Sequence, residues 1–76
     1  MSDERVYIKE ISVFEKDMNA VMCILALLDP GESFKVSYEG YPVNTHTFHF
    51  DNEWFAQDDL EFNLKNVDIK KIVYYI

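Results

Sequence analysis

The chain has 76 residues, of which 49% are hydrophobic and 16% aromatic, and its 14 acids against 7 bases give a net charge of −7. This apolar content excludes a disordered acidic tail and predicts one small folded domain over residues 1–76. A chain of this size buries only about 60% of its unfolded surface, so it needs a staple or a second copy. Cys23 is the single cysteine and there is no zinc-ligand set, which leaves a homodimer as the obvious stabiliser.

The negative charge indicates the kind of partner. It repels nucleic acid and anionic membranes and attracts basic surfaces, so we expect no direct nucleic-acid binding and no membrane association. The longest apolar run, residues 20–28, is far shorter than the ~20 residues that span a bilayer. The chain starts with MSDER and no long apolar region follows, so we expect no secretory signal and a cytoplasmic location, in its own cell or in a host cell.

The first third of the chain predicts a strand followed by a helix. Residues 5–13 (RVYIKEISV) are rich in β-branched residues. A change in the phase of their alternation predicts a β-bulge near residues 9–10, or burial on both faces. Ser12 and Glu15 match a capping box, which predicts a helix over residues 14–28.

The outer face of this helix carries no charge after Asp17. A surface helix on a small sheet normally shows charges along that face. Short residues that tolerate water would explain the pattern, but contact with a second subunit explains it better in so small a domain. The predicted dimer interface consists of Asn19, Cys23, Ala26 and Leu27.

The rest of the chain predicts further strands. A proline–glycine turn at residues 29–32 ends the helix. Alternating apolar and polar residues then predict strands at 33–41, 45–50, 60–64 and 70–76. Residues 54–59 fit a short strand, a helical turn or a loop. We therefore expect an α+β fold, with one helix packed on an antiparallel sheet of about four strands in the order β-α-β-β-β.

The residue types that carry chemistry are sparse. His46 and His49 lie on opposite faces of a strand and cannot share a metal. His49 and Asp51 share a face and form only a weak metal or acid–base candidate. Cys23 is expected to be a buried, inert thiol. The sequence has no calcium loop and no phosphate-binding glycine loop, so we predict no enzyme, no catalytic residues, no metal and no cofactor.

The stretch from Val36 to Leu64 contains six acids and seven aromatic residues but no lysine or arginine. If residues 51–61 were extended, they would span about 36 Å and carry one charge every ~7 Å. One DNA strand presents a phosphate every ~3.4 Å, so the segment is about half as dense. A second copy of the chain would supply a second row of charge.

Some aromatic residues lie in predicted turns beside these acids, namely Tyr41, Trp54 and Phe55. Turn aromatics commonly cap the ends of a core, but Trp and Tyr are also enriched at binding hot spots. Acids around such anchors would steer a basic partner toward them. The predicted partner-binding residues are Glu39, Asp51, Glu53, Asp58, Asp59, Glu61, Trp54 and Phe55.

In size, charge and element order over its whole length, the chain resembles the small acidic DNA-mimic inhibitors encoded by bacteriophages. These proteins shut down host DNA-binding proteins such as the histone-like HU. The resemblance implies host takeover as the role, a basic DNA-binding protein as the partner, and the six acids of the base-free stretch as substitutes for phosphates.

Three other readings stay open. An immunity protein or antitoxin would use the same acids to block an enzyme's active site. A small enzyme or metal protein would use His49 and Asp51. A subunit of a larger assembly would use the outer face of the helix as its contact.

Overall fold

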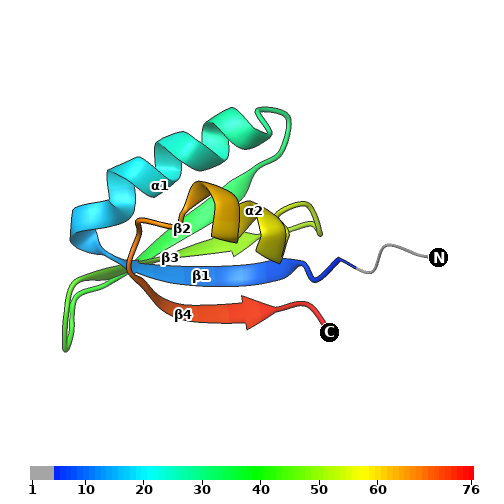
Figure 1. The fold of residues 1–76 in the computed structure, drawn as a ribbon. Coiled ribbons are helices and arrows are strands. Elements are labelled where there is room, and N and C mark those ends of the chain that lie inside the picture. Colours follow the sequence, from blue (N-terminus) through cyan, green and yellow to red (C-terminus); the bar gives the residue numbers. More distant parts are fainter. Residues whose placement is uncertain (1–4) are drawn as a thin grey trace.

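A computed structural model describes residues 5–76 (Figure 1). In chain order the elements are β1 (Ile8–Phe14), α1 (Glu15–Leu28), β2 (Phe34–Glu39), β3 (Thr45–Phe50), α2 (Gln57–Asn63) and β4 (Ile69–Tyr74). The strands form one antiparallel sheet in the order β2-β3-β1-β4. The predicted α+β class, with a main helix on a four-stranded sheet, is confirmed. Residues 1–4, on which the prediction of no secretory signal depends, lie outside the described residues.

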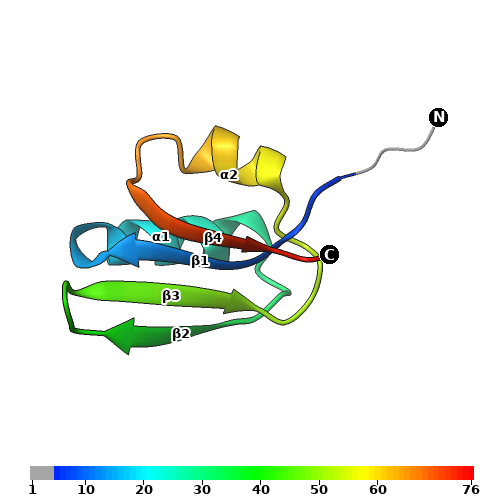
Figure 2. The same cartoon turned by 90° about the horizontal axis from the view of Figure 1, so that it is seen from below.

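The molecule has two layers. Both helices lie on one side of the sheet, and the other face of the sheet is open (Figures 1 and 2). The core lies under α1, where Val21 and Leu25 meet Ile11 and Phe48 of the central strands. None of the helices formed by residues 5–76 is long and apolar enough to cross a bilayer.

β1 shows how pairing overrides local signals. Its register with β4 shifts between Ile8 and Glu10, which confirms the predicted bulge. The predicted capping box is wrong, because α1 has Phe14 as its N-cap residue and no side-chain cap. Ser12 lies inside β1, where its hydroxyl is 2.8 Å from that of Thr47. Pairing with β3 continues as far as Phe14, so the strand holds Ser12 away from the helix start.

The strand predicted at residues 60–64 is wrong, because this segment belongs to α2. Leu60 and Leu64 are four residues apart and both face the core, as helical spacing requires. Phe62, between them, is 77% exposed. Asp59 accepts a hydrogen bond from the backbone N–H of Ala56 (3.1 Å) and so caps the first turn. The element order is therefore β-α-β-β-α-β, and β4 pairs with β1 instead of continuing a meander.

Candidate functional site

Three carboxylates, Glu32, Asp51 and Glu53, gather at one end of the sheet, and we call them the acidic end. Glu32 lies in the loop between α1 and β2, whereas the other two follow β3. The pairing of Phe34 with Phe50 brings these two loops together. The side-chain amide of Asn52 donates a hydrogen bond to Glu32 across the gap (3.2 Å).

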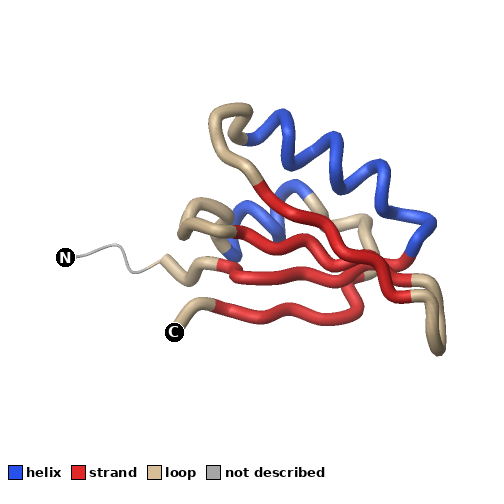
Figure 3. The backbone as a smooth tube through the Cα atoms, turned by 180° about the vertical axis from the view of Figure 1, so that it is seen from behind, coloured by secondary structure: helices blue, strands red, loops and turns tan. Residues whose placement is uncertain are grey.

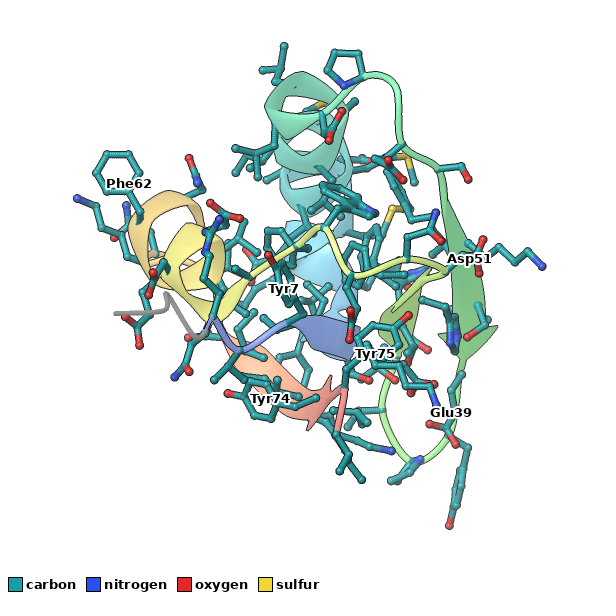
Figure 4. All side chains as sticks on the ribbon, turned by 90° about the vertical axis from the view of Figure 1, so that its right-hand side faces the viewer. Tyr7, Glu39, Asp51, Phe62, Tyr74 and Tyr75 are labelled. Carbon is teal, nitrogen blue, oxygen red and sulfur yellow. The ribbon has the colours of Figure 1, made fainter. Side chains whose placement is uncertain are left out.

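The pKa of Tyr75 responds to the negative charges at this end of the sheet. Its hydroxyl donates a hydrogen bond to the backbone carbonyl of Phe50, the last residue of β3. Burial raises the pKa of Tyr75, and the nearby charges of Asp51 and Glu53 raise it further. Figure 4 shows Tyr75 and Asp51 from this end of the molecule. Both carboxylates therefore act on the same half-buried phenol.

The acidic end is not neutralised within residues 5–76. Within these residues, the ion pairs that involve lysine or arginine are Arg5 with Asp59 (3.6 Å), Lys16 with Asp17 (3.5 Å) and Lys16 with Asp68 (2.9 Å). The Lys16 side chain is exposed, and the hydrogen bond to Asp68 is the main cause that raises its pKa. None of these cations is within 4 Å of Glu32, Asp51 or Glu53. The negative charge of these three carboxylates therefore remains free to attract a positively charged group of another molecule.

The six acids of the base-free stretch do not form one surface. Glu39 pairs with Thr45 at the far end of the β2–β3 hairpin, a full strand length from Asp51. Asp58, Asp59 and Glu61 lie on α2, so residues 51–61 do not form one extended row of charge. Asp59 caps α2 and pairs with Arg5, which makes it a structural residue.

The two predicted aromatic anchors belong to the core. Phe55 is fully buried and stacks on Phe50, with ring centroids 5.0 Å apart. Trp54 is half-buried and meets the Phe50 ring edge-on at 5.4 Å. Phe55 therefore offers a partner no surface, and its predicted role as an anchor is wrong, whereas Trp54 stays a predicted partner-binding residue. The exposed aromatic residues are Tyr38 at 59%, Tyr41 at 84%, Tyr74 at 37% and Phe62 at 77%, whose side chain points outward from α2 (Figure 4).

The histidines lie on opposite faces of β3, as predicted, but His49 does not pair with Asp51. Its Nδ1 is 3.2 Å from a carboxylate oxygen of Glu10, and its Nε2 is 2.9 Å from the hydroxyl of Ser37. Sequence reasoning missed this set because the residues come from β1, β2 and β3. No group of His, Cys, Asp or Glu within residues 5–76 has the arrangement of a metal site.

A hydroxyl, an imidazole and a carboxylate follow one another in the set Ser37, His49 and Glu10. This is the order of nucleophile, general base and orienting acid in covalent catalysis. They lie on the open face of the sheet, where the side chains of His49 and Glu10 are 36% and 29% exposed. The neighbouring hydrogen bond between Ser12 and Thr47 continues the same polar row. Hydrogen bonding between polar side chains on neighbouring strands accounts for this arrangement, and no catalytic role is needed to explain it.

The predicted dimer interface on α1 is accessible. All four of its residues are exposed, and Leu27 reaches 81%. Cys23 is exposed too, so the expectation of a buried thiol is wrong. The helix turns its other side, with Val21 and Leu25, toward the sheet. Contact between subunits on this face stays a prediction, and its residues are Asn19, Cys23, Ala26 and Leu27.

Comparison with known proteins gives no match of any kind. The chain matches no protein-family model. Searches of the curated proteins and of the solved structures find no match either. The charges and the geometry of the residues themselves therefore carry the functional assignment.

Proposed function

We propose that this protein binds a basic surface on another protein and blocks it, with the acidic end as the principal contact. The observation that carries the proposal is the gathering of Glu32, Asp51 and Glu53 at the end of β3, with no lysine or arginine of residues 5–76 within 4 Å. The favoured target is the nucleic-acid-binding face of a cytoplasmic DNA-binding protein, such as a histone-like protein of a host cell. This target rests on the resemblance in size and charge to phage DNA mimics.

The physical basis is electrostatic complementarity. Exposed charges of one sign steer a partner of the opposite sign and speed up its association, and this effect weakens as salt is added. Asp51 and Glu53 are exposed, so a basic surface reaches them without rearrangement. Asp58 and Glu61 carry further negative charge on the exposed side of α2, away from the acidic end. A DNA-binding protein offers such a basic surface by necessity.

The test is capture of partners from bacterial lysate on the immobilised protein at low salt, eluted with a salt gradient and identified by mass spectrometry. Affinity for the captured protein is then compared between the wild type and an Asp51→Asn/Glu53→Gln variant. We expect the variant to bind about tenfold more weakly at low salt, because two exposed contacts worth up to ~1 kcal/mol each are removed. The difference should shrink at high salt.

The matched control is Glu39→Gln/Asp58→Asn, which changes the net charge equally but lies away from the acidic end. Equal losses in the two variants would show that only net charge matters, and would overturn the assignment to the acidic end. A captured partner with no affinity for nucleic acid would favour an immunity protein or antitoxin over a DNA mimic.

A further inference from the structure

β2 is an edge strand whose outer side meets no other segment of residues 5–76 (Figure 3). Its six residues pair with β3 in one continuous register, from Phe34 opposite Phe50 to Glu39 opposite Thr45. It contains no bulge and no proline. A regular edge of this kind presents a row of unpaired backbone N–H and C=O groups, which is a template for another strand.

Apolar side chains flank this edge on the helix side of the sheet. Because α1 packs chiefly over β1 and β3, it leaves this part of β2 uncovered. Val36 is 37% exposed and Tyr38 is 59% exposed. On the open side of the sheet, the same strand carries Lys35, Ser37 and Glu39, all exposed.

The strand is complementary to itself. If two copies of β2 run antiparallel about a two-fold axis at Ser37, Lys35 of each copy lies opposite Glu39 of the other. The same register sets Val36 opposite Tyr38 on the helix side. Directly opposite residues interact, and opposite charges stabilise the pair.

Neighbouring registers lose this match. An axis at Val36 sets Lys35 opposite Ser37, and an axis at Tyr38 sets Glu39 opposite Ser37. We propose that a second copy of this chain occupies the β2 edge, antiparallel and with its axis at Ser37, which joins the two sheets into one and leaves both α1 helices on the same side. This interface differs from the predicted contact on the outer face of α1.

A cysteine at the axis tests the register directly. In a Cys23→Ser background, Ser37→Cys places the two new thiols in directly opposite positions, where α-carbons are about 4.5–5.5 Å apart. That spacing suits a disulfide. The control Lys35→Cys puts the two thiols about 13 Å apart, because each lies opposite position 39 of the other copy. Mild oxidation should cross-link the Ser37→Cys variant only, as seen by non-reducing electrophoresis.

A charge swap tests the same pairing without cysteines. Lys35→Glu alone or Glu39→Lys alone creates two like-charged pairs in each dimer. We expect each single variant to weaken dimerisation about tenfold at low salt, measured by analytical ultracentrifugation. The double variant Lys35→Glu/Glu39→Lys restores opposite charges and should regain wild-type affinity.

Three results would overturn the proposal. The first is a wild-type protein that is monomeric at about 100 µM. The second is equal cross-linking at positions 35 and 37. The third is a dimer that is insensitive to both charge reversals but lost when Ala26→Glu alters the outer face of α1. None of these outcomes bears on the acidic end, whose test uses a captured partner.

Discussion

The two edges of the sheet are built differently. β4 carries two exposed lysines, Lys70 and Lys71, and its register with β1 shifts twice. α2 lies on that side of the molecule (Figure 2). β2 pairs with β3 in an unbroken register. It carries apolar residues on one face and one positive and one negative residue, Lys35 and Glu39, on the other. Lysines and bulges are the devices that keep an edge from pairing. The comparison indicates that one edge is protected and the other is kept available.

The β2 pairing also changes what a second copy does for the acidic end. Both β2 strands start at their own acidic end, since Phe34 pairs with Phe50 beside Asp51. Antiparallel strands run in opposite directions, so the two acidic ends lie on opposite sides of the dimer. The second copy therefore does not supply a second row beside the first. It provides two separate contacts for basic partners.

The largest expected effect comes from β3, which pairs with the edge strand β2 on one side and with β1 on the other. Phe48 lies on β3, is fully buried and pairs with Ile11 on one side and Val36 on the other. We expect Phe48→Ala to lower the free energy of unfolding by about 3–5 kcal/mol, because it leaves a large cavity. The control Val36→Ala removes a half-exposed side chain at the edge and should cost less than about 1.5 kcal/mol. Urea unfolding at one fixed protein concentration measures both, and equal losses would contradict this placement of the core.

The next prediction removes the protection from β4. Lys70→Thr/Lys71→Thr replaces the edge lysines with β-forming residues of no charge. We expect a protein that now associates through both edges and forms species larger than a dimer, seen by light scattering. The control Lys16→Thr/Lys65→Thr removes the same charge elsewhere. Unchanged size for the β4 variant would show that the bulges, and not the lysines, protect this edge.

A smaller effect is expected at Tyr75, which ties the chain after β4 to the end of β3. Tyr75→Phe removes the hydrogen bond to Phe50 and should cost about 1 kcal/mol. The folded-state pKa of Tyr75 lies above its ordinary value of 10.0, so the neutral phenol is favoured in the folded protein. This contribution is complete below pH 10 and is lost as the pH rises through the raised pKa.

An NMR titration that follows the ring of Tyr75 separates the causes of that pKa shift, because absorbance does not distinguish the five tyrosines of the chain. Asp51→Asn removes one of the charges that raise it, so the variant should ionise Tyr75 at a lower pH than the wild type. Glu39→Gln, at the far end of the hairpin, should leave the titration unchanged. A shift of equal size in both variants would contradict the placement of Asp51 beside the phenol.

The pattern of apolar and polar residues predicted an element correctly where that pattern matches the burial of the residues in the fold. The strand at 45–50 and the helix that ends at Leu28 match the structure at those bounds. Leu60, Phe62 and Leu64 alternate like a strand, but Phe62 faces solvent while the two leucines share a helical face. The i, i+4 spacing of those leucines and the acids of the first turn were the available signals.

The candidate site was less predictable than the fold. The acidic end depends on Glu32, which is 19 residues before Asp51 in the sequence and reaches it only through the pairing of β2 with β3. Ser37, His49 and Glu10 meet for the same reason. The sequence shows the excess of acidic residues directly, but only the pairing of the strands decides which of them lie together.

The smallest expected effect distinguishes the acids of α2, on the side of the protected edge. Asp59 accepts the backbone hydrogen bond of Ala56 and lies 3.6 Å from Arg5, whereas Asp58 is exposed. Asp59→Asn should lower the free energy of unfolding by about 0.5–1 kcal/mol, because it weakens the cap and removes a surface ion pair. Asp58→Asn should change it by less than about 0.5 kcal/mol. Thermal unfolding of the two variants checks this, and the reverse order would show that Asp59 is not the capping residue. Because the two variants have the same net charge, any difference between them reflects the role of one carboxylate in holding α2.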